Sequence, residues 1–195
     1  MMTRSRLEAF SDGVIAIVLT IMMLDLKVPA TGEISGLRPV IPAFLSHVLS
    51  FVLVGIYWNN HHHLFQAVRS VNGAVLLANL HLLFWISLVP FGTSWLGSSN
   101  FATWPVVVYG IVQLFSAVAY FILVHLLVCH HGRDSTLAKA LTTDFKGKIS
   151  LVLYALALPL AFLHPWLACG VCCLVAAMWL IPDRRIETTI TQHQP

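Results

Sequence analysis

The stretch that decides the fold reads RLEAFSDGVIAIVLTIMML, from Arg6 to Leu24. A short polar head leads directly into an apolar helix. The apolar part, residues 14–24, spans only about 16 Å at the helical rise per residue, so a helix that crosses a bilayer has to begin before Ser11. Asp12 then lies within the membrane span, where a charge is costly unless it is paired or hydrated. The polar head therefore indicates either a functional polar group at membrane depth or a helix-start cap made by Ser11 or Asp12.

The same helix carries an apolar stripe, because residues that recur at about 100° per position share one face. The members of the stripe are Gly13, Ile17, Thr20, Ile21 and Leu24. Thr20 supplies its only hydroxyl, and both Ser11 and Asp12 fall off it. Periodicity alone favours an ordinary stripe that faces the core or the lipid, because such stripes are the norm on helices.

The composition is that of a membrane protein. Of 195 residues, 58% are hydrophobic and 10% are charged, whereas about a quarter of a soluble domain is charged. No Asp, Glu, Lys or Arg occurs in the 63 residues of 70–132 or in the 34 residues of 149–182. Since a spanning helix takes about 20 residues, the first run holds two or more spans and the second at most two. The net charge of +3 gives no reason to expect nucleic acid, because the basic residues belong to loops.

The sequence predicts one all-α membrane domain over residues 1–195, with six transmembrane helices. The helices are expected at about 5–27, 39–65, 71–96, 102–129, 149–163 and 166–181. Pro90 is expected to kink the third helix, and Pro165 to separate the last two. Residues 130–148 form a polar loop, in which 135–145 are expected as a short surface helix.

Six spans place both termini on one side of the membrane, and the distribution of Lys and Arg indicates which side. Nine basic residues fall on the side of the termini and two, Lys27 and Arg38, on the other. The nine are Arg4, Arg6, Arg69, Arg133, Lys139, Lys146, Lys148, Arg184 and Arg185. Because cytoplasmic loops carry the excess of Lys and Arg, we expect a multi-pass protein of the cell membrane with both termini and the 130–148 loop in the cytoplasm.

Three consecutive histidines, residues 61–63, end the second expected helix. Neighbours on a helix point about 100° apart, so the three cannot bind one ion, and no acid or second histidine follows at the spacing of a helical metal motif. We expect hydrogen bonding instead, with one histidine turned inward to Asp12. No metal site and no cofactor is expected. The sequence has no phosphate loop, no nucleophile elbow and no paired carboxylates in one span, so an enzyme is not expected.

Three motifs resemble one family closely. They are Arg6-x-x-x-Phe10-Ser11-Asp12, then Tyr57-Trp58-x-x-His61-His62-x-x-Phe65, and then Asn79 followed by Pro90-Phe91. Together they resemble the transmembrane protein 175 family of potassium channels. The resemblance covers the first three helices, and the last three match only in hydropathy and number.

The resemblance implies a potassium channel with four copies of the first helix around a central pore. Animal members carry two six-helix repeats, so a chain with one repeat is similar to a prokaryotic member that forms a homotetramer. In the family the constriction is hydrophobic, and this chain indeed lacks the TVGYG loop of a carbonyl filter. The family's pore isoleucine falls on Ile17, its threonine on Thr20, and further apolar rings on Ile21 and Leu24. The implied partners are other copies of the chain, the bilayer and the permeant potassium ion.

The resemblance also implies a structural or gating network at the polar head of the first helix. Its members would be Arg6, Phe10, Ser11, Asp12, Trp58, His61, His62 and Asn79. Which histidine turns inward is left open by the sequence. A secondary transporter is the main alternative, although neither inverted repeats nor interrupted helices at the midplane are visible. A histidine-based membrane metalloprotein is the second alternative.

Overall fold

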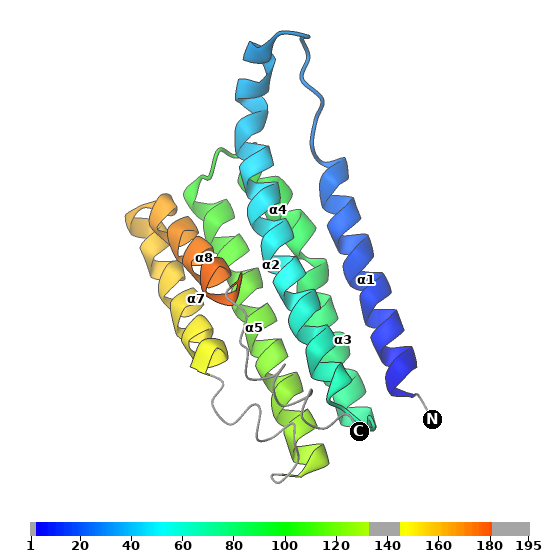
Figure 1. The fold of residues 1–195 in the computed structure, drawn as a ribbon. Coiled ribbons are helices and arrows are strands. Elements are labelled where there is room, and N and C mark those ends of the chain that lie inside the picture. The colour runs from blue at the N-terminus through cyan, green and yellow to red at the C-terminus, as the bar shows by residue number, and fades with distance from the viewer. Residues whose placement is uncertain (1–2, 133–144, 181–195) are drawn as a thin grey trace.

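The computed structural model describes residues 3–132 and 145–180, and over these residues the chain is helical with short connections (Figure 1). The helices are α1 (Arg4–Leu24), the 3-10 helix η1 (Ile34–Val40), α2 (Ile41–Gln66), α3 (Gly73–Ser87), α4 (Val89–Ser98), α5 (Thr103–His131), α7 (Phe145–Leu163) and α8 (Pro165–Leu180). The η1 helix continues into α2, and α4 follows α3 after one residue, so the chain crosses the bundle six times. The prediction of an all-α membrane fold is confirmed.

Two helix starts are fixed by side-chain caps. Thr3 accepts a hydrogen bond from the backbone N–H of Arg6 at 3.4 Å before α1, and Asn72 accepts one from the N–H of Val75 at 2.9 Å before α3. Such caps satisfy backbone donors that have no partner inside the helix. Because Thr3 caps α1, neither Ser11 nor Asp12 does, and the helix-start interpretation of the polar head is wrong.

Proline marks two helix starts. The third span was expected to be one helix kinked at Pro90, but it is two helices with Leu88 between them, and Pro90 is the second residue of α4. Pro165 is the first residue of α8. A proline lacks the N–H and its ring clashes with the preceding turn, so it fits best in the first turn of a helix. Pro159, inside α7, is an exception.

Among the described residues, five stretches are long and apolar enough to cross a membrane, namely Arg4–Leu24, Ile34–Gln66, Gly73–Ser98, Thr103–His131 and Phe145–Leu163. The sixth, α8, is apolar but has only 16 residues. Most of the surface helix expected at 135–145 lies outside the described residues.

The spans alternate in direction, with the start of α1 at the lower end of Figure 1 and the α1–α2 connection at the upper end. The described basic residues divide accordingly. Those at the end where α1 starts are Arg4, Arg6, Arg69, Lys146 and Lys148, and those at the opposite end are Lys27 and Arg38. We call the first of these the basic end of the bundle.

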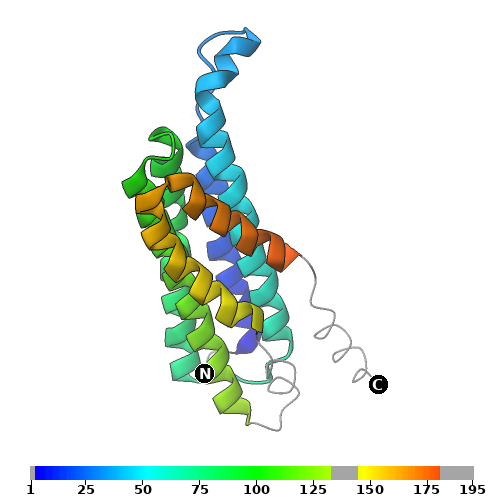
Figure 2. The same ribbon diagram turned by 90° about the vertical axis from the view of Figure 1, so that its left-hand side faces the viewer.

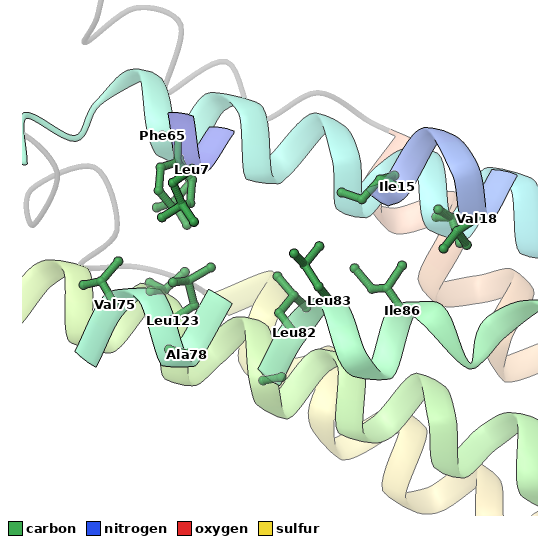
Figure 3. Packing of buried hydrophobic residues seen from close by; sticks show 14 of the residues in the cluster. Leu7, Ile15, Val18, Phe65, Val75, Ala78, Leu82, Leu83, Ile86 and Leu123 are labelled. Carbon is green, nitrogen blue, oxygen red and sulfur yellow. The ribbon is translucent and has the colours of Figure 1, made fainter. Parts of the chain in front are cut away.

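The apolar core has two parts. One part joins α1 to α2, α3 and α5, and the other joins α2, α4, α5, α7 and α8. Figure 3 shows how Ile15 and Val18 of α1 lie opposite Leu83 and Ile86 of α3. In Figures 1 and 2, α1 lies at one edge of the bundle and α7 with α8 at the other. Because α1 is an edge helix, only one of its faces is buried by its own chain.

A buried group of hydroxyls fixes α4 within the second part of the core. Thr93 donates to Ser50 at 2.6 Å, Ser50 lies 3.0 Å from the hydroxyl of Tyr109, and Ser46 donates to the carbonyl of Thr93 at 3.1 Å. Gly97 permits the close approach, because a Cβ there would lie 2.6 Å from the Cα of Ala43. These contacts therefore hold α4 against α2 and α5, next to the end of α1.

Candidate functional site

The stripe predicted on α1 is the face that the chain's own bundle leaves open. Ile17 is 58% exposed, Ile21 45% and Leu24 83%, and Gly13 and Thr20 are exposed as well. The opposite face supplies the buried residues of the helix, which are Leu7, Ser11, Ile15, Val18 and Met22. The stripe is therefore not a core face within one subunit. An exposed apolar face in a membrane protein meets lipid or another chain.

Thr20 lies in the middle of this open face. Its hydroxyl donates to the carbonyl of Ile17, in the preceding turn of the same helix, at 2.9 Å. The bond uses the only hydrogen of the hydroxyl and leaves the lone pairs of Oγ1 free to accept. The geometry thus presents an acceptor oxygen on an otherwise apolar surface.

The buried face of the same helix carries a chain of polar groups. Ser11 donates to the carbonyl of Leu7 at 2.9 Å, so its oxygen accepts from Nδ2 of Asn79 at 2.9 Å. Oδ1 of Asn79 then accepts from Nε2–H of His61 at 2.8 Å. Ser11, His61 and Asn79 are each 0% exposed. This chain of groups joins α1, α2 and α3 through buried hydrogen bonds, and it requires a proton on Nε2 of His61.

The partner of Asp12 differs from the expectation. His61 does turn inward, but it binds Asn79, and Oδ1 of Asp12 accepts instead from Nε1–H of Trp58 at 3.1 Å. The Trp58 ring stacks on His62, with ring centroids 6.0 Å apart and planes 16° apart. The carboxylate of Asp12 is therefore hydrogen-bonded by a side chain of α2, whereas Ser11 is hydrogen-bonded by Asn79 of α3.

Two residues of the polar head take no part in these contacts. The side chains of Arg6 and Phe10 are exposed, and within residues 3–132 and 145–180 neither makes a side-chain hydrogen bond. Their place in the network implied by the resemblance finds no support within one subunit.

Glu8 is a further partner of α2, one that the motifs did not predict. Oε1 of Glu8 lies 3.2 Å from Nδ1 of His62, and Arg4 donates to the carbonyl of Val68 at 3.1 Å. The contacts repeat every four residues on two antiparallel helices, and we call this set the α1–α2 ladder. It comprises Arg4, Glu8 and Asp12 on α1 and Trp58, His62 and Gln66 on α2, with Val68 just beyond α2. The signal was present in the spacing, since positions four apart share a helix face.

Metal binding has no support among the described residues, because no three of their His, Cys, Asp or Glu side chains come together.

Comparisons with known proteins agree with the all-helical membrane fold. The family model described as endosomal/lysosomal potassium channel TMEM175 matches residues 6–90. A potassium channel of Chryseobacterium sp. (strain P1-3) is 52% identical over 98% of this chain and 100% of that one. A potassium channel of Chamaesiphon minutus is 33% identical over 88% of this chain and 90% of that one. The crystal structure of a lysosomal potassium-selective channel TMEM175 homolog from Chamaesiphon minutus superimposes with a TM-score of 0.80 at 31% identity, covering 91% of this chain and 96% of that one.

Proposed function

This chain belongs to the endosomal/lysosomal potassium channel TMEM175 family, and we propose that it conducts potassium through a pore lined by α1. It is a potassium channel and not an enzyme. The single observation that carries the proposed pore is the open stripe of α1, which lies opposite a face that is fully used by the chain's own core. An edge helix with one face buried and one face free is suited to surround an axis with other copies of itself.

In the proposed homotetramer, each stripe residue occurs four times and forms a ring. Rings of Ile17, Ile21 and Leu24 would make a hydrophobic constriction, which gates by excluding water rather than by closing a carbonyl filter. Arg6 and Phe10 are exposed on the same helix and are available to a neighbouring subunit. The described basic residues support a cell-membrane orientation with the basic end in the cytoplasm.

The oligomeric state of purified protein, measured by mass in detergent and by imaging in a lipid disc, tests this proposal. Four copies with α1 at the axis are expected. A stable monomer, or a tetramer with the stripe facing lipid, would contradict it. Single-channel recordings separate the channel from a secondary transporter, because ion flux through a channel exceeds the turnover of a carrier.

Asp12 is expected to maintain the structure of the pore helix rather than to bind the permeant ion. It lies off the stripe and accepts from Trp58. Asp12→Ala should lower the yield of assembled channel or shift gating by about fivefold, since a partly exposed hydrogen bond to a charge contributes about 1 kcal/mol. The potassium-to-sodium permeability ratio should stay the same. Trp58→Phe, which removes only the donor, should reproduce the effect, and Asp12→Asn, which keeps the acceptor, should be milder. An altered ratio with normal assembly and gating would assign Asp12 to the ion path.

Thr20 is expected to set potassium selectivity. In a tetramer, four Oγ1 atoms with free lone pairs would form one ring of oxygens beside the hydrophobic rings. An ion that enters an apolar neck loses hydration energy, and only oxygen atoms replace it; potassium holds its water less tightly than sodium. Thr20→Val keeps the shape and removes the oxygen, so reversal potentials under bi-ionic conditions should give a permeability ratio close to one. Thr20→Ser, which retains the oxygen, is the matched control. An unchanged ratio in a conducting Thr20→Val channel would place selectivity elsewhere.

A further inference from the structure

Glu8 contacts a partly exposed imidazole of α2. Its Oε1 lies 3.2 Å from Nδ1 of His62, and its Oε2 lies 3.7 Å from Nε of Arg4. On the other side of the His62 ring, Nε2 lies 2.8 Å from Nε2 of Gln66. The side chain of Glu8 is 15% exposed and that of His62 36%. A mostly buried carboxylate is therefore held by a partly exposed histidine of α2.

We infer that Glu8 is a positioning residue of the channel, which sets through His62 how firmly α1 is held against α2, and that protons at the basic end adjust this hold. The inference rests on the proposed function, in which α1 lines the pore. Glu8 precedes Ile17 by nine residues, or about 14 Å along the helix. The contact therefore restrains the start of the pore helix without touching the stripe.

The two protonation states of His62 hold Glu8 with different strength. In the neutral state, Nδ1–H donates to Glu8 and Nε2 accepts from the amide of Gln66. In the protonated state the first bond joins two charges, and such bonds are about twice as strong as neutral ones. Nε2–H then needs an acceptor, which the Gln66 amide supplies by turning its oxygen inward. Protonation of His62 therefore strengthens the α1–α2 ladder.

No other titratable group near Glu8 and His62 is placed as well to change the contact between α1 and α2. The other titratable or charged groups nearby are Arg4 and Asp12 on α1 and His61 and His63 on α2. Arg4 lies 3.7 Å from Glu8, and Asp12 accepts from Trp58. His61 is buried and is committed to Asn79, the neutral group that α3 contributes. His63 lies beside His62 and makes no hydrogen bond to α1 within the described ranges.

The test is potassium flux from liposomes at symmetric pH, about 5.5 and about 8. We expect the parent flux to differ about two- to fivefold between them, the size of a partly exposed ion pair. Glu8→Gln and His62→Gln at the lower pH should behave like the parent at the higher pH. His62→Arg carries a permanent charge, so at the higher pH it should behave like the parent at the lower pH. His63→Gln, the same change one residue away, should keep the parent profile.

A parent flux that does not depend on pH, or a Glu8→Gln profile identical to the parent profile, would overturn the inference. If Glu8→Gln does not assemble, His62→Arg decides alone, because it retains the pair. Ile17→Asn measured at one pH separates this inference from the proposed pore. If Ile17→Asn raises the leak while Glu8→Gln keeps the parent pH profile, only the role of Glu8 is contradicted. If Ile17→Asn leaks no more than the parent, the pore itself is contradicted.

Discussion

Replacing Ile17 by Asn is expected to raise the resting potassium leak by about tenfold or more. Ile17 is 58% exposed on the open face of α1, and in the proposed tetramer four copies meet at the axis. Burying one isoleucine from water is worth about 1.5–3 kcal/mol, and about 1.4 kcal/mol is already a factor of ten in an equilibrium. Four amide groups would hydrate a neck that is otherwise dry. Potassium flux from liposomes and single-channel recordings would both report the change.

Met23→Asn is the matched control, because Met23 is 59% exposed on the same helix but lies off the stripe. It introduces the same polar group at a similar depth and should leave the leak unchanged. If Ile17→Asn and the parent leak equally, or if Met23→Asn leaks as much as Ile17→Asn, Ile17 does not line the ion path.

The sequence was sufficient for the general fold and for separating the two faces of α1, but periodicity alone did not predict which face stays open. Runs of 63 and 34 uncharged residues left no choice but membrane helices, and the 100° period separated Ile17 and Thr20 from Ser11 before any neighbour was known. The third span was harder. A proline weakens the helix around it in either case, and whether the result is a kink or a break at Leu88 depends on how α4 packs against α2 and α5.

The partners of the polar head could not be predicted, because they depend on how α1 and α2 are shifted and rotated relative to each other. His61 and His62 point about 100° apart, so turning one toward α3 necessarily turns the other toward Glu8. Which histidine turns toward α3 depends on the position of α3 itself. His61 is the one that does so, and it donates a hydrogen bond to Asn79 on α3. Asp12 is then left to Trp58, one turn further along the ladder.

Asn79→Leu is expected to cost the most stability of any single change in the polar chain. Asn79 is 0% exposed and binds Ser11 and His61 at once, at 2.9 Å and 2.8 Å. Leucine fills a similar volume but leaves both partners buried without their bond, at about 1–3 kcal/mol for each. The total of about 2–6 kcal/mol is a large part of the stability of an ordinary domain. Thermal melting in detergent should therefore show a clear loss, with little assembled channel.

The matched control for Asn79→Leu is Asn60→Leu at the polar end of α2. The side chain of Asn60 bonds the carbonyl of Ile56 in its own helix at 2.8 Å, so its removal leaves no other helix with an unpaired group. A second measurement is a double-mutant cycle with Ser11→Ala. Because Ser11 and Asn79 share one bond, the double variant should lose less stability than the sum of the single variants. Additive losses, or an Asn79→Leu channel that melts with the parent, would mean that the buried chain does not hold α1 to α3.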